Sequence, residues 1–187
     1  MRVVLPAFTT KRITQSTPAS SASNVITVSI SPTLDLSGSA SAAITLTNLT
    51  GAVLGESVTL GAVTGGQSGE GLFCGASADG TSGTAAWSAE SSSLVLRLCT
   101  GATMSAGEEY AFSFTITNPG SGQESPSVSV EASGDAADYA ASAMTRDTET
   151  SVLGIAGGAS PLKVVEPVFT TKRITQSTPA SSASNVI

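Results

Sequence analysis

The 187-residue chain contains no histidine, and only 12% of its residues are charged. Without histidine, neither a Ser-His-Asp nor a Cys-His arrangement can be built within the chain, and the commonest metal ligand is missing as well. The carboxylate pairs that remain, such as Asp147 with Glu149, fall in expected loops, where charges are normally solvated. We therefore predict that the protein is not an enzyme and uses no cofactor. A calcium site built from Asp135, Asp138 or Asp147 is the alternative for these carboxylates.

Basic residues and long apolar runs are also scarce. Eight Lys and Arg stand against fourteen Asp and Glu, and the longest basic run is Lys11-Arg12 with its copy Lys172-Arg173. Because this small number of positive charges cannot neutralise a phosphate backbone, we expect no nucleic-acid partner. No apolar stretch reaches the roughly 18 residues that a membrane-spanning helix needs. The first residues also lack the long apolar region of a complete signal peptide.

Cysteine occurs only twice, as Cys74 and Cys99. An even count without histidine argues against a zinc site and favours a disulfide, with two buried free thiols as the alternative. Because disulfides persist mainly outside the cytosol, the pair predicts an extracellular or cell-surface protein.

Apolar residues alternate with Ser, Thr and other small residues through most of the chain, as in half-buried antiparallel strands. The clearest runs are residues 26–30, 44–47, 94–98, 110–117 and 127–130, and further candidates are 57–63, 72–74, 84–88 and 138–144. Gly, Asn and Asp turn signals separate these runs, and no long helical stripe is present. About eight to ten short strands predict an all-β fold, namely an antiparallel β-sandwich of immunoglobulin-like or jelly-roll type.

The chain carries one long internal repeat. Residues 3–26 read VVLPAFTTKRITQSTPASSASNVI, and residues 164–187 read VVEPVFTTKRITQSTPASSASNVI, so 22 of 24 aligned positions are identical at an offset of 161. The two differences are Leu5 against Glu166 and Ala7 against Val168. One interpretation is a tandem array with a 161-residue period. The other is a single subunit that places one copy in itself and the other in a neighbour. Both predict end-to-end assembly.

The repeated segment differs from the rest of the chain in composition. Its prolines and its Ser/Thr-rich stretch at residues 16–23 are typical of an extended connector. We therefore divide the chain into a connector at residues 1–24, a β-sandwich at 25–162 and a second connector at 163–187. The sharper hypothesis is that the connector adds a strand to the exposed edge of a neighbouring domain, whereas the alternative is a strand of the domain's own sheet followed by a surface loop. The apolar residues expected to dock are Val4, Phe8 and Ile13 in the first copy and Val165, Phe169 and Ile174 in the second.

Several phrases of the sequence resemble a known kind of repeat. FTTKRITQSTPASSASNVITVSI, AAITLTNLTG and AGEEYAFSFTITNPGSGQESPSVSVEASG are similar to tandem repeats of about 160 residues in very large predicted extracellular proteins of microalgae. The similarity covers nearly the whole period, but it is a repeat signature without catalytic residues to carry over. The architecture more loosely resembles immunoglobulin-like pilus subunits that polymerise by strand donation, which is an analogy of fold.

These observations favour a structural repeat unit of an extracellular fibre or surface filament, whose partner is another copy of itself. The alternative is an adhesin or carbohydrate-binding module on a repetitive stalk. Trp87 would be its candidate sugar-stacking residue, although a lone Trp in a β-sandwich is more often part of the core. Asn48 begins the one N-glycosylation sequon, Asn48-Leu49-Thr50, and residues 16–23 resemble an O-glycosylated linker in composition, so glycans are possible partners.

Overall fold

The protein is built almost entirely of β-strands, which confirms the all-β prediction. The computed structural model describes residues 4–38, 42–64, 67–134, 138–169, 171–182 and 184. Within these ranges the one helical element is a short 3-10 turn, η1 (Glu70–Leu72). The strands are β1 (Phe8–Gln15), β2 (Ser23–Pro32), β3 (Leu36–Ser37), β4 (Ala43–Thr47), β5 (Ser57–Ala62), β6 (Gln67–Ser68), β7 (Thr84–Ser88), β8 (Ser93–Arg97), β9 (Thr103–Met104), β10 (Tyr110–Thr117), β11 (Ser129–Ser133), β12 (Tyr139–Ala143) and β13 (Thr145–Arg146).

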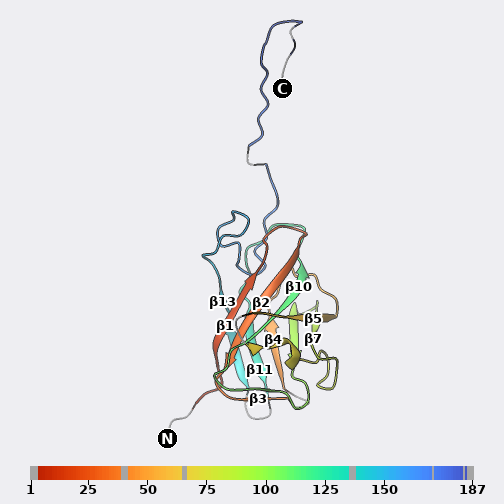
Figure 1. Ribbon diagram of the computed structural model, residues 1–187, viewed down its shortest axis with the longest axis vertical. Coiled ribbons are helices and arrows are strands. Elements are labelled where there is room, and N and C mark those ends of the chain that lie inside the picture. The colour runs from red at the N-terminus through yellow and green to blue at the C-terminus, as the bar shows by residue number, and fades with distance from the viewer. Residues whose placement is uncertain are drawn as a thin grey trace.

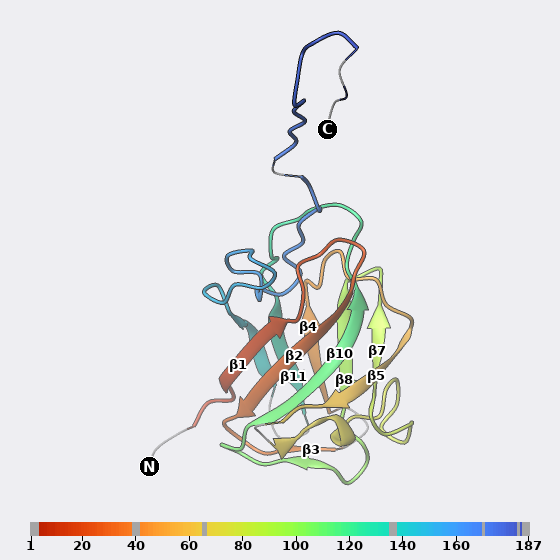
Figure 2. The same cartoon turned by 45° about the horizontal axis from the view of Figure 1, so that its top comes forward.

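Ten of these strands follow one another in a continuous hydrogen-bonded path, in the order β12-β11-β4-β8-β7-β5-β10-β2-β1-β13. The path folds over on itself, so that β1, β2, β10 and β5 form one layer and β4, β7, β8 and β11 lie behind it (Figures 1 and 2). Only Met144 separates β12 from β13, so the two ends of the path are joined by the chain itself. The result is a β-sandwich whose layers are linked at both sides, close to a flattened barrel.

The core lies between the two layers and follows the period-two pattern of the sequence. Ile26, Val28 and Ile30 of β2 are fully buried, and Phe112 and Phe114 of β10 are buried opposite the other layer. The outward positions of the same strands carry Ser and Thr, which suit a pleated, partly solvated surface. This alternation accounts for most of the strands that the sequence predicted.

The predicted disulfide is present. Cys74 and Cys99 are bonded, with their Cα atoms 5.0 Å apart, and close a loop over a sequence separation of 25 residues. The bond ties the chain that follows η1 to the end of β8, where Cys74 N–H also donates to the carbonyl of Arg97. A loop of this length stabilises the fold by about 3 kcal/mol in the chain-entropy account.

The first copy of the repeated segment is part of the sandwich. The composition predicts a connector at residues 1–24, but Phe8–Gln15 is β1 and pairs with β2 along nearly its whole length. Residues 16–22 form the loop between these two strands. The alternative of a strand in the domain's own sheet followed by a surface loop therefore describes the first copy. The chain reaches β1 at one end of the sandwich, and residues 166–169 and 171–182 leave at the other (Figure 1).

Candidate functional site at the two copies of the repeated segment

β1 fills a slot between β2 and β13. It is antiparallel to β2 in the register Phe8 with Pro32 through Gln15 with Ile26. On its other side only Arg12 and Ile13 pair, in parallel, with Thr145 and Arg146. β1 therefore closes the seam of the sandwich.

A β-bulge lets two apolar side chains of β1 face the core. Phe8 and Ile13 are five residues apart, which would place them on opposite faces of a regular strand. The register shifts between Phe8 and Thr10, and this extra residue brings both side chains to the inner face, where they are 5% and 0% exposed. Bulges of this kind break the alternation that reveals a strand in a sequence.

Phe8 packs against Tyr139 at the leading end of the domain, which we define as residues 4–7 with Thr33 and Leu34. The two ring centroids are 4.9 Å apart. The Tyr139 hydroxyl donates to the carbonyl of Leu34 at 2.6 Å and accepts from the Leu34 N–H at 3.1 Å. Burial raises the pKa of Tyr139 above its ordinary value of 10.0, although the hydrogen bond with Leu34 works in the opposite direction. Phe8 thus completes a contact that fixes the leading end.

A buried polar cluster anchors the opposite end of β1. Gln15 Nε2 donates to the carbonyls of Gly158 and Lys163 at 2.9 and 2.8 Å. Its Oε1 accepts from the N–H of Leu162 at 2.7 Å and from Asn24 Nδ2 at 2.9 Å. Gln15 is only 5% exposed, so these bonds satisfy its whole amide in a buried position. The cluster ties the first copy to the last residues before the second copy.

Asn24 and Asn118 extend this cluster to the loop between β1 and β2. Asn24 Nδ2 donates to Asn118 Oδ1 at 2.8 Å, and Asn118 Nδ2 donates to the carbonyls of Thr17 and Ala19 at 3.1 and 2.8 Å. Asn24 Oδ1 accepts from the N–H groups of Ser16 and Thr17 at 3.1 and 3.2 Å. The Ser/Thr-rich stretch is therefore held in a packed loop in this copy, although its composition is typical of a linker.

The loop holds the chain where the second copy begins. Val165 N–H donates to the carbonyl of Pro18 at 2.8 Å, and the Val165 carbonyl accepts from the N–H of Ser20 at 3.2 Å. Glu166 Oε1 accepts from the N–H of Gly122 at 3.0 Å. Beyond this point the described residues belong to no strand, and Phe169 and Ile174 are 83% and 79% exposed.

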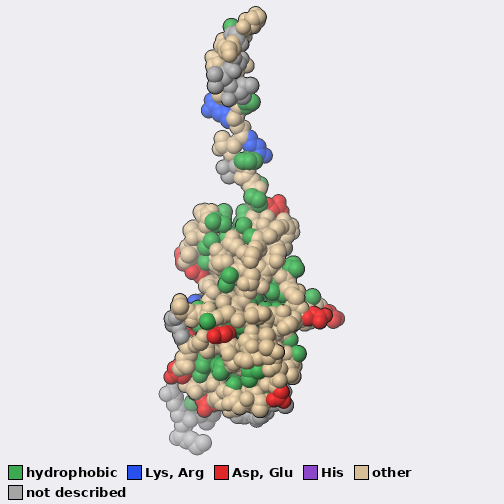
Figure 3. Space-filling view, turned by 45° about the vertical axis from the view of Figure 1, so that its right-hand side comes forward, with side chains coloured by type: hydrophobic (Ala, Val, Ile, Leu, Met, Phe, Trp, Pro, Cys, Tyr) green, Lys and Arg blue, Asp and Glu red, His purple; other side chains and the backbone are tan. Residues whose placement is uncertain are grey.

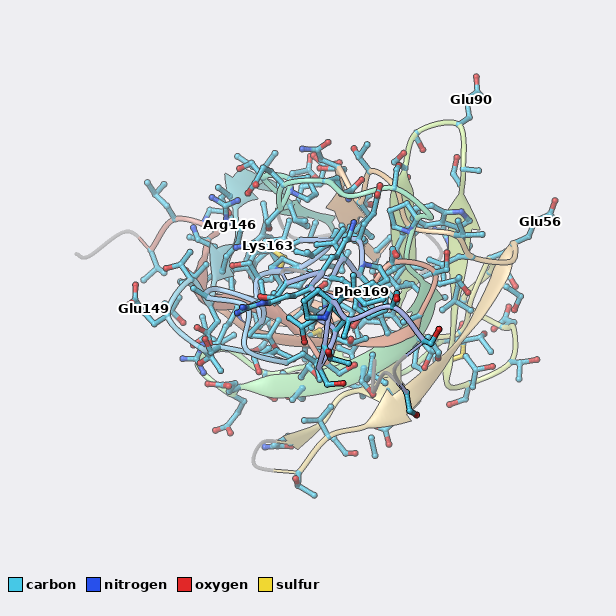
Figure 4. The ribbon with its side chains drawn as sticks, turned by 90° about the horizontal axis from the view of Figure 1, so that it is seen from above. Glu56, Glu90, Arg146, Glu149, Lys163 and Phe169 are labelled. Atoms are coloured by element: carbon cyan, nitrogen blue, oxygen red, sulfur yellow. A yellow bond between two sulfur atoms is a disulfide. The ribbon has the colours of Figure 1, made fainter. Side chains whose placement is uncertain are left out.

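The two copies thus have opposite surroundings despite their near-identity. Phe8 and Ile13 are buried, whereas their counterparts Phe169 and Ile174 are exposed. Figure 4 shows the molecule from the end at which the second copy leaves the sandwich. Phe169 belongs to the segment that projects toward the viewer, and Lys163 belongs to the packed chain before it. The projecting segment carries a sequence that this fold buries elsewhere.

The exposure of the aromatic side chains shows the same difference between the two copies. All eight lie in the described part of the chain, and Phe169 alone is exposed. Trp87 is 9% exposed and belongs to the core, as a lone Trp in a sandwich usually does. No aromatic ring other than Phe169 is therefore presented on the surface for stacking on a sugar.

The other predicted sites have the following positions. Val4 is 49% exposed in the leading end, and Val165 is half-buried at the opposite end of the sandwich. Asn48 is exposed, with its Nδ2 donating to the carbonyl of Ser127 at 3.0 Å and its Oδ1 accepting from the Thr50 hydroxyl at 2.9 Å. Its glycosylation stays a prediction.

The acidic residues show no metal centre within the described ranges, where no group of three or more His, Cys, Asp or Glu gathers. Asp135 lies outside the described residues. Hydrogen bonds from Thr150 and Glu149 hold the pKa of the exposed Asp147 below its ordinary value, as is usual for a carboxylate that caps a turn. No helix of the described chain is long and apolar enough to cross a membrane.

Comparisons with known proteins add no family. No protein-family model matches the chain, and no curated protein is detectably similar to it. The resemblance to extracellular repeats of microalgae therefore stays a prediction.

The sequence alone does not reveal the polar cluster of Gln15, Asn24 and Asn118. Gln15 and Asn24 lie in the repeated segment, on either side of a Ser/Thr-rich stretch. In such a stretch nothing distinguishes a buried amide side chain from one that faces solvent. The identity of Gln15 with Gln176 across the two copies was the one available signal, because a simple tether does not need a particular amide at that position.

Proposed function

We propose that this chain is a structural unit of an extracellular fibre or surface filament, and that its second copy forms β1 of the next unit. The observation that carries the proposal is the pair Phe8 and Phe169, of which the first is 5% and the second 83% exposed in nearly identical segments. Burying an exposed phenylalanine side chain contributes about 1.5–3 kcal/mol. The slot that accepts this sequence is already defined by β2 and β13.

Geometry prevents the second copy from filling the slot of its own chain. β1 runs from the leading end toward the loop that holds Val165, so a copy in the same orientation must begin at the far end of the sandwich. Seven steps of β-strand separate Phe8 from Gln15, a length of about 24 Å. Only four residue steps separate Val165 from Phe169, and they reach about 14 Å when fully extended. The partner slot therefore belongs to another unit.

Two assemblies satisfy this requirement. In a covalent tandem array, the next 161 residues of the same polypeptide fold around the second copy. In strand donation, the second copy of one chain enters the slot of another chain, which requires that this slot is free of its own first copy. Both produce a head-to-tail series because the chain enters and leaves at opposite ends (Figure 2). A series of this type does not close into a ring unless the units rotate appropriately, so it grows as a filament.

A structural role also accounts for the rest of the chain. The disulfide is compatible with an extracellular or cell-surface location, and glycans at Asn48 would cover part of a surface poor in charge. The proposal assigns no catalysis to the protein and needs no cofactor. Its partner is a second copy of the same sequence.

The test is to empty the slot. A chain of residues 23–187 lacks β1 but keeps β2, β13 and the second copy. We expect it to form head-to-tail polymers in electron micrographs and by light scattering, whereas the full chain, with its slot occupied, stays monomeric.

The matched control is the same shortened chain with Phe169→Ser and Ile174→Ser, which should not polymerise. In the full chain the same two substitutions should leave the fold intact, because both side chains are exposed there. Polymers that persist in the substituted short chain, or a short chain that stays monomeric, would contradict the proposed function.

A further inference from the structure

The stretch between one unit and the next is very short. Val165 is the last residue whose backbone the sandwich holds, through Pro18 and Ser20. Phe169 corresponds to Phe8, the first residue of β1. If the second copy is β1 of the next unit, only residues 166–168 lie between two folded domains, and Pro167 stiffens them by fixing its own φ and favouring extended backbone before it.

The first copy shows how the next unit would hold these three residues. Thr33 Oγ1 donates to the carbonyl of Leu5 at 2.8 Å and accepts from the N–H of Ala7 at 2.9 Å. The N–H of Thr33 donates to the carbonyl of Ala7 at 2.9 Å. Leu5 and Ala7 correspond to Glu166 and Val168, so the Thr33 of the next unit would hold both, while Glu166 also bonds Gly122 of its own unit. The residues between the domains would then be held from both sides.

The two positions at which the copies differ are Leu5 against Glu166 and Ala7 against Val168. Both lie within the three residues between the units, and the remaining 22 positions are identical. Glu166 makes a hydrogen bond with Gly122 that a leucine cannot make. Val168 lines an apolar groove that an alanine would fill less well. The two side chains that differ therefore contact the surface of the preceding unit. The residues that would enter the slot of the next unit are identical in the two copies.

That groove is part of the trailing end, which we define as Pro18, Ala19, Leu153, Ile155 and Val165. It has a volume of about 290 Å³ and is lined by these five residues with Glu166, Pro167 and Val168. Hydrophobic side chains are visible on this end of the body, around the base of the projecting segment (Figure 3). In the next unit, residues 165–168 stand in the place of residues 4–7, together with the Thr33 and Leu34 of that unit. With three residues between the units, this leading end would lie directly against the groove.

Leu153 gives an independent indication that the trailing end is covered. It is 73% exposed at the tip of a tight turn in which Val152 and Ile155 exchange both backbone hydrogen bonds, at 3.2 and 2.9 Å. Leu153 and Gly154 have φ values of 53° and 75°. Asn or Gly normally occupies the first of these positions, because a branched side chain is strained there. A strained residue that also exposes a large apolar side chain points to a function for that side chain.

We propose that consecutive units abut, with the leading end of each unit seated on the trailing end of the one before it and with Leu153 as a central contact. The inference rests on the proposed function. The resulting filament is a stiff rod and not a string of tethered domains. Its axial repeat is at most about 55 Å. This sum takes about 24 Å for β1, about 10 Å across the Gln15 side chain and its hydrogen bond to the Lys163 carbonyl, and about 21 Å for extended chain from Lys163 to Phe169.

The experiment uses a two-unit chain, residues 1–187 followed directly by residues 27–187, which continues the repeat without a break. Leu153→Asn is introduced in the first unit only. The matched control carries the same substitution in the second unit, whose trailing end has no following unit. Small-angle X-ray scattering and ¹⁵N relaxation report the distance between the domains and whether they tumble together. Asparagine suits the positive φ, so the variant keeps its fold.

We expect the parent and the control to behave as one rigid body, and the first-unit variant to show a broader distance distribution with the rotational correlation time falling toward that of a single unit. If the first-unit variant matches the control, or if the parent domains already tumble independently, the abutting interface is wrong. Hydrogen exchange at residues 169–176 separates this failure from that of the proposed function. Protected amides there would support the proposed function even if the abutting interface is wrong. Unprotected amides would contradict both the proposed function and the abutting interface.

Discussion

Phe8 and Phe169 occupy equivalent positions in two nearly identical segments, yet the first is buried against Tyr139 at 4.9 Å between ring centroids and the second is 83% exposed. A single chain therefore shows the same sequence once paired with β2 and β13 and once, in the described residues of the second copy, outside any strand. The difference lies in the slot between β2 and β13, which a single chain has only once. Each residue of the first copy thus has an internal control 161 positions later.

Alanine substitutions at the paired phenylalanines should have very different effects on the single chain. Phe8→Ala should lower the free energy of unfolding by about 3–5 kcal/mol, because it removes a buried ring from the core. Phe169→Ala should change it by less than about 0.5 kcal/mol, as expected for an exposed position. Urea denaturation of both variants measures the difference. Equal effects would mean that the second copy also packs on its own domain.

The buried cluster at the end of β1 should couple the two copies. Gln15→Ala leaves the N–H of Leu162 and the amide of Asn24 without their partner, and we expect a loss of about 2–3 kcal/mol in stability. The protection of residues 158–165 against hydrogen exchange should fall as well. Gln176→Ala is the control, since Gln176 is exposed in this chain. Unchanged protection in Gln15→Ala would show that the cluster does not anchor this segment.

Tyr139 should make the stability depend on pH in the alkaline range. Because burial raises its pKa above 10.0 in the folded protein, folding favours the neutral phenol. The corresponding stability is fully present below the unfolded pKa of about 10 and is lost as the pH rises through the folded pKa. Urea midpoints between pH 8 and pH 11 test this. Tyr139→Phe should cost about 1 kcal/mol near neutral pH and flatten the alkaline decrease. An equally steep decrease in that variant would assign the effect to another group.

The disulfide should stabilise the sandwich without being needed for assembly. Reduction of Cys74–Cys99 should lower the free energy of unfolding by about 3 kcal/mol, which thermal melts with and without reductant measure. A double Cys→Ala variant should melt near the reduced parent and should not respond to reductant. Polymerisation of the shortened chain should survive both treatments, because neither cysteine lies in or pairs with β1, β2 or β13. Loss of polymers would place the bond within the interface.

Most of the sandwich could be predicted from the sequence because its strands are half-buried and antiparallel. β10 is an example, since Tyr110, Phe112, Phe114 and Ile116 alternate with smaller residues and are all buried. For β1 the sequence left two alternatives open, a strand of the domain's own sheet or a strand added to a neighbour, because the bulge between Phe8 and Thr10 breaks the alternation and Lys11 and Arg12 occupy its middle. Its strand character comes from the partners β2 and β13. The same sequence without those partners belongs to no strand and is exposed in residues 171–176.

The trailing end was likewise hidden in the sequence. Residues 147–165 show neither period two nor a helical stripe, and their arrangement depends on bonds to distant groups such as Gln15 and Pro18. Leu153 gives no sequence signal, because the positive φ that makes it unusual is a property of the folded turn. The repeat itself could be read directly, together with the expectation of end-to-end assembly.

The most direct test of the account is amide hydrogen exchange at residues 169–176, measured in the single chain and in the two-unit chain. We predict rapid exchange in the single chain and, in the two-unit chain, protection equal to that of Phe8–Gln15, because the second copy then pairs with a β2 and a β13 of its own. Rapid exchange at these residues in both chains would contradict the claim that the repeated segment is the strand that joins one unit to the next.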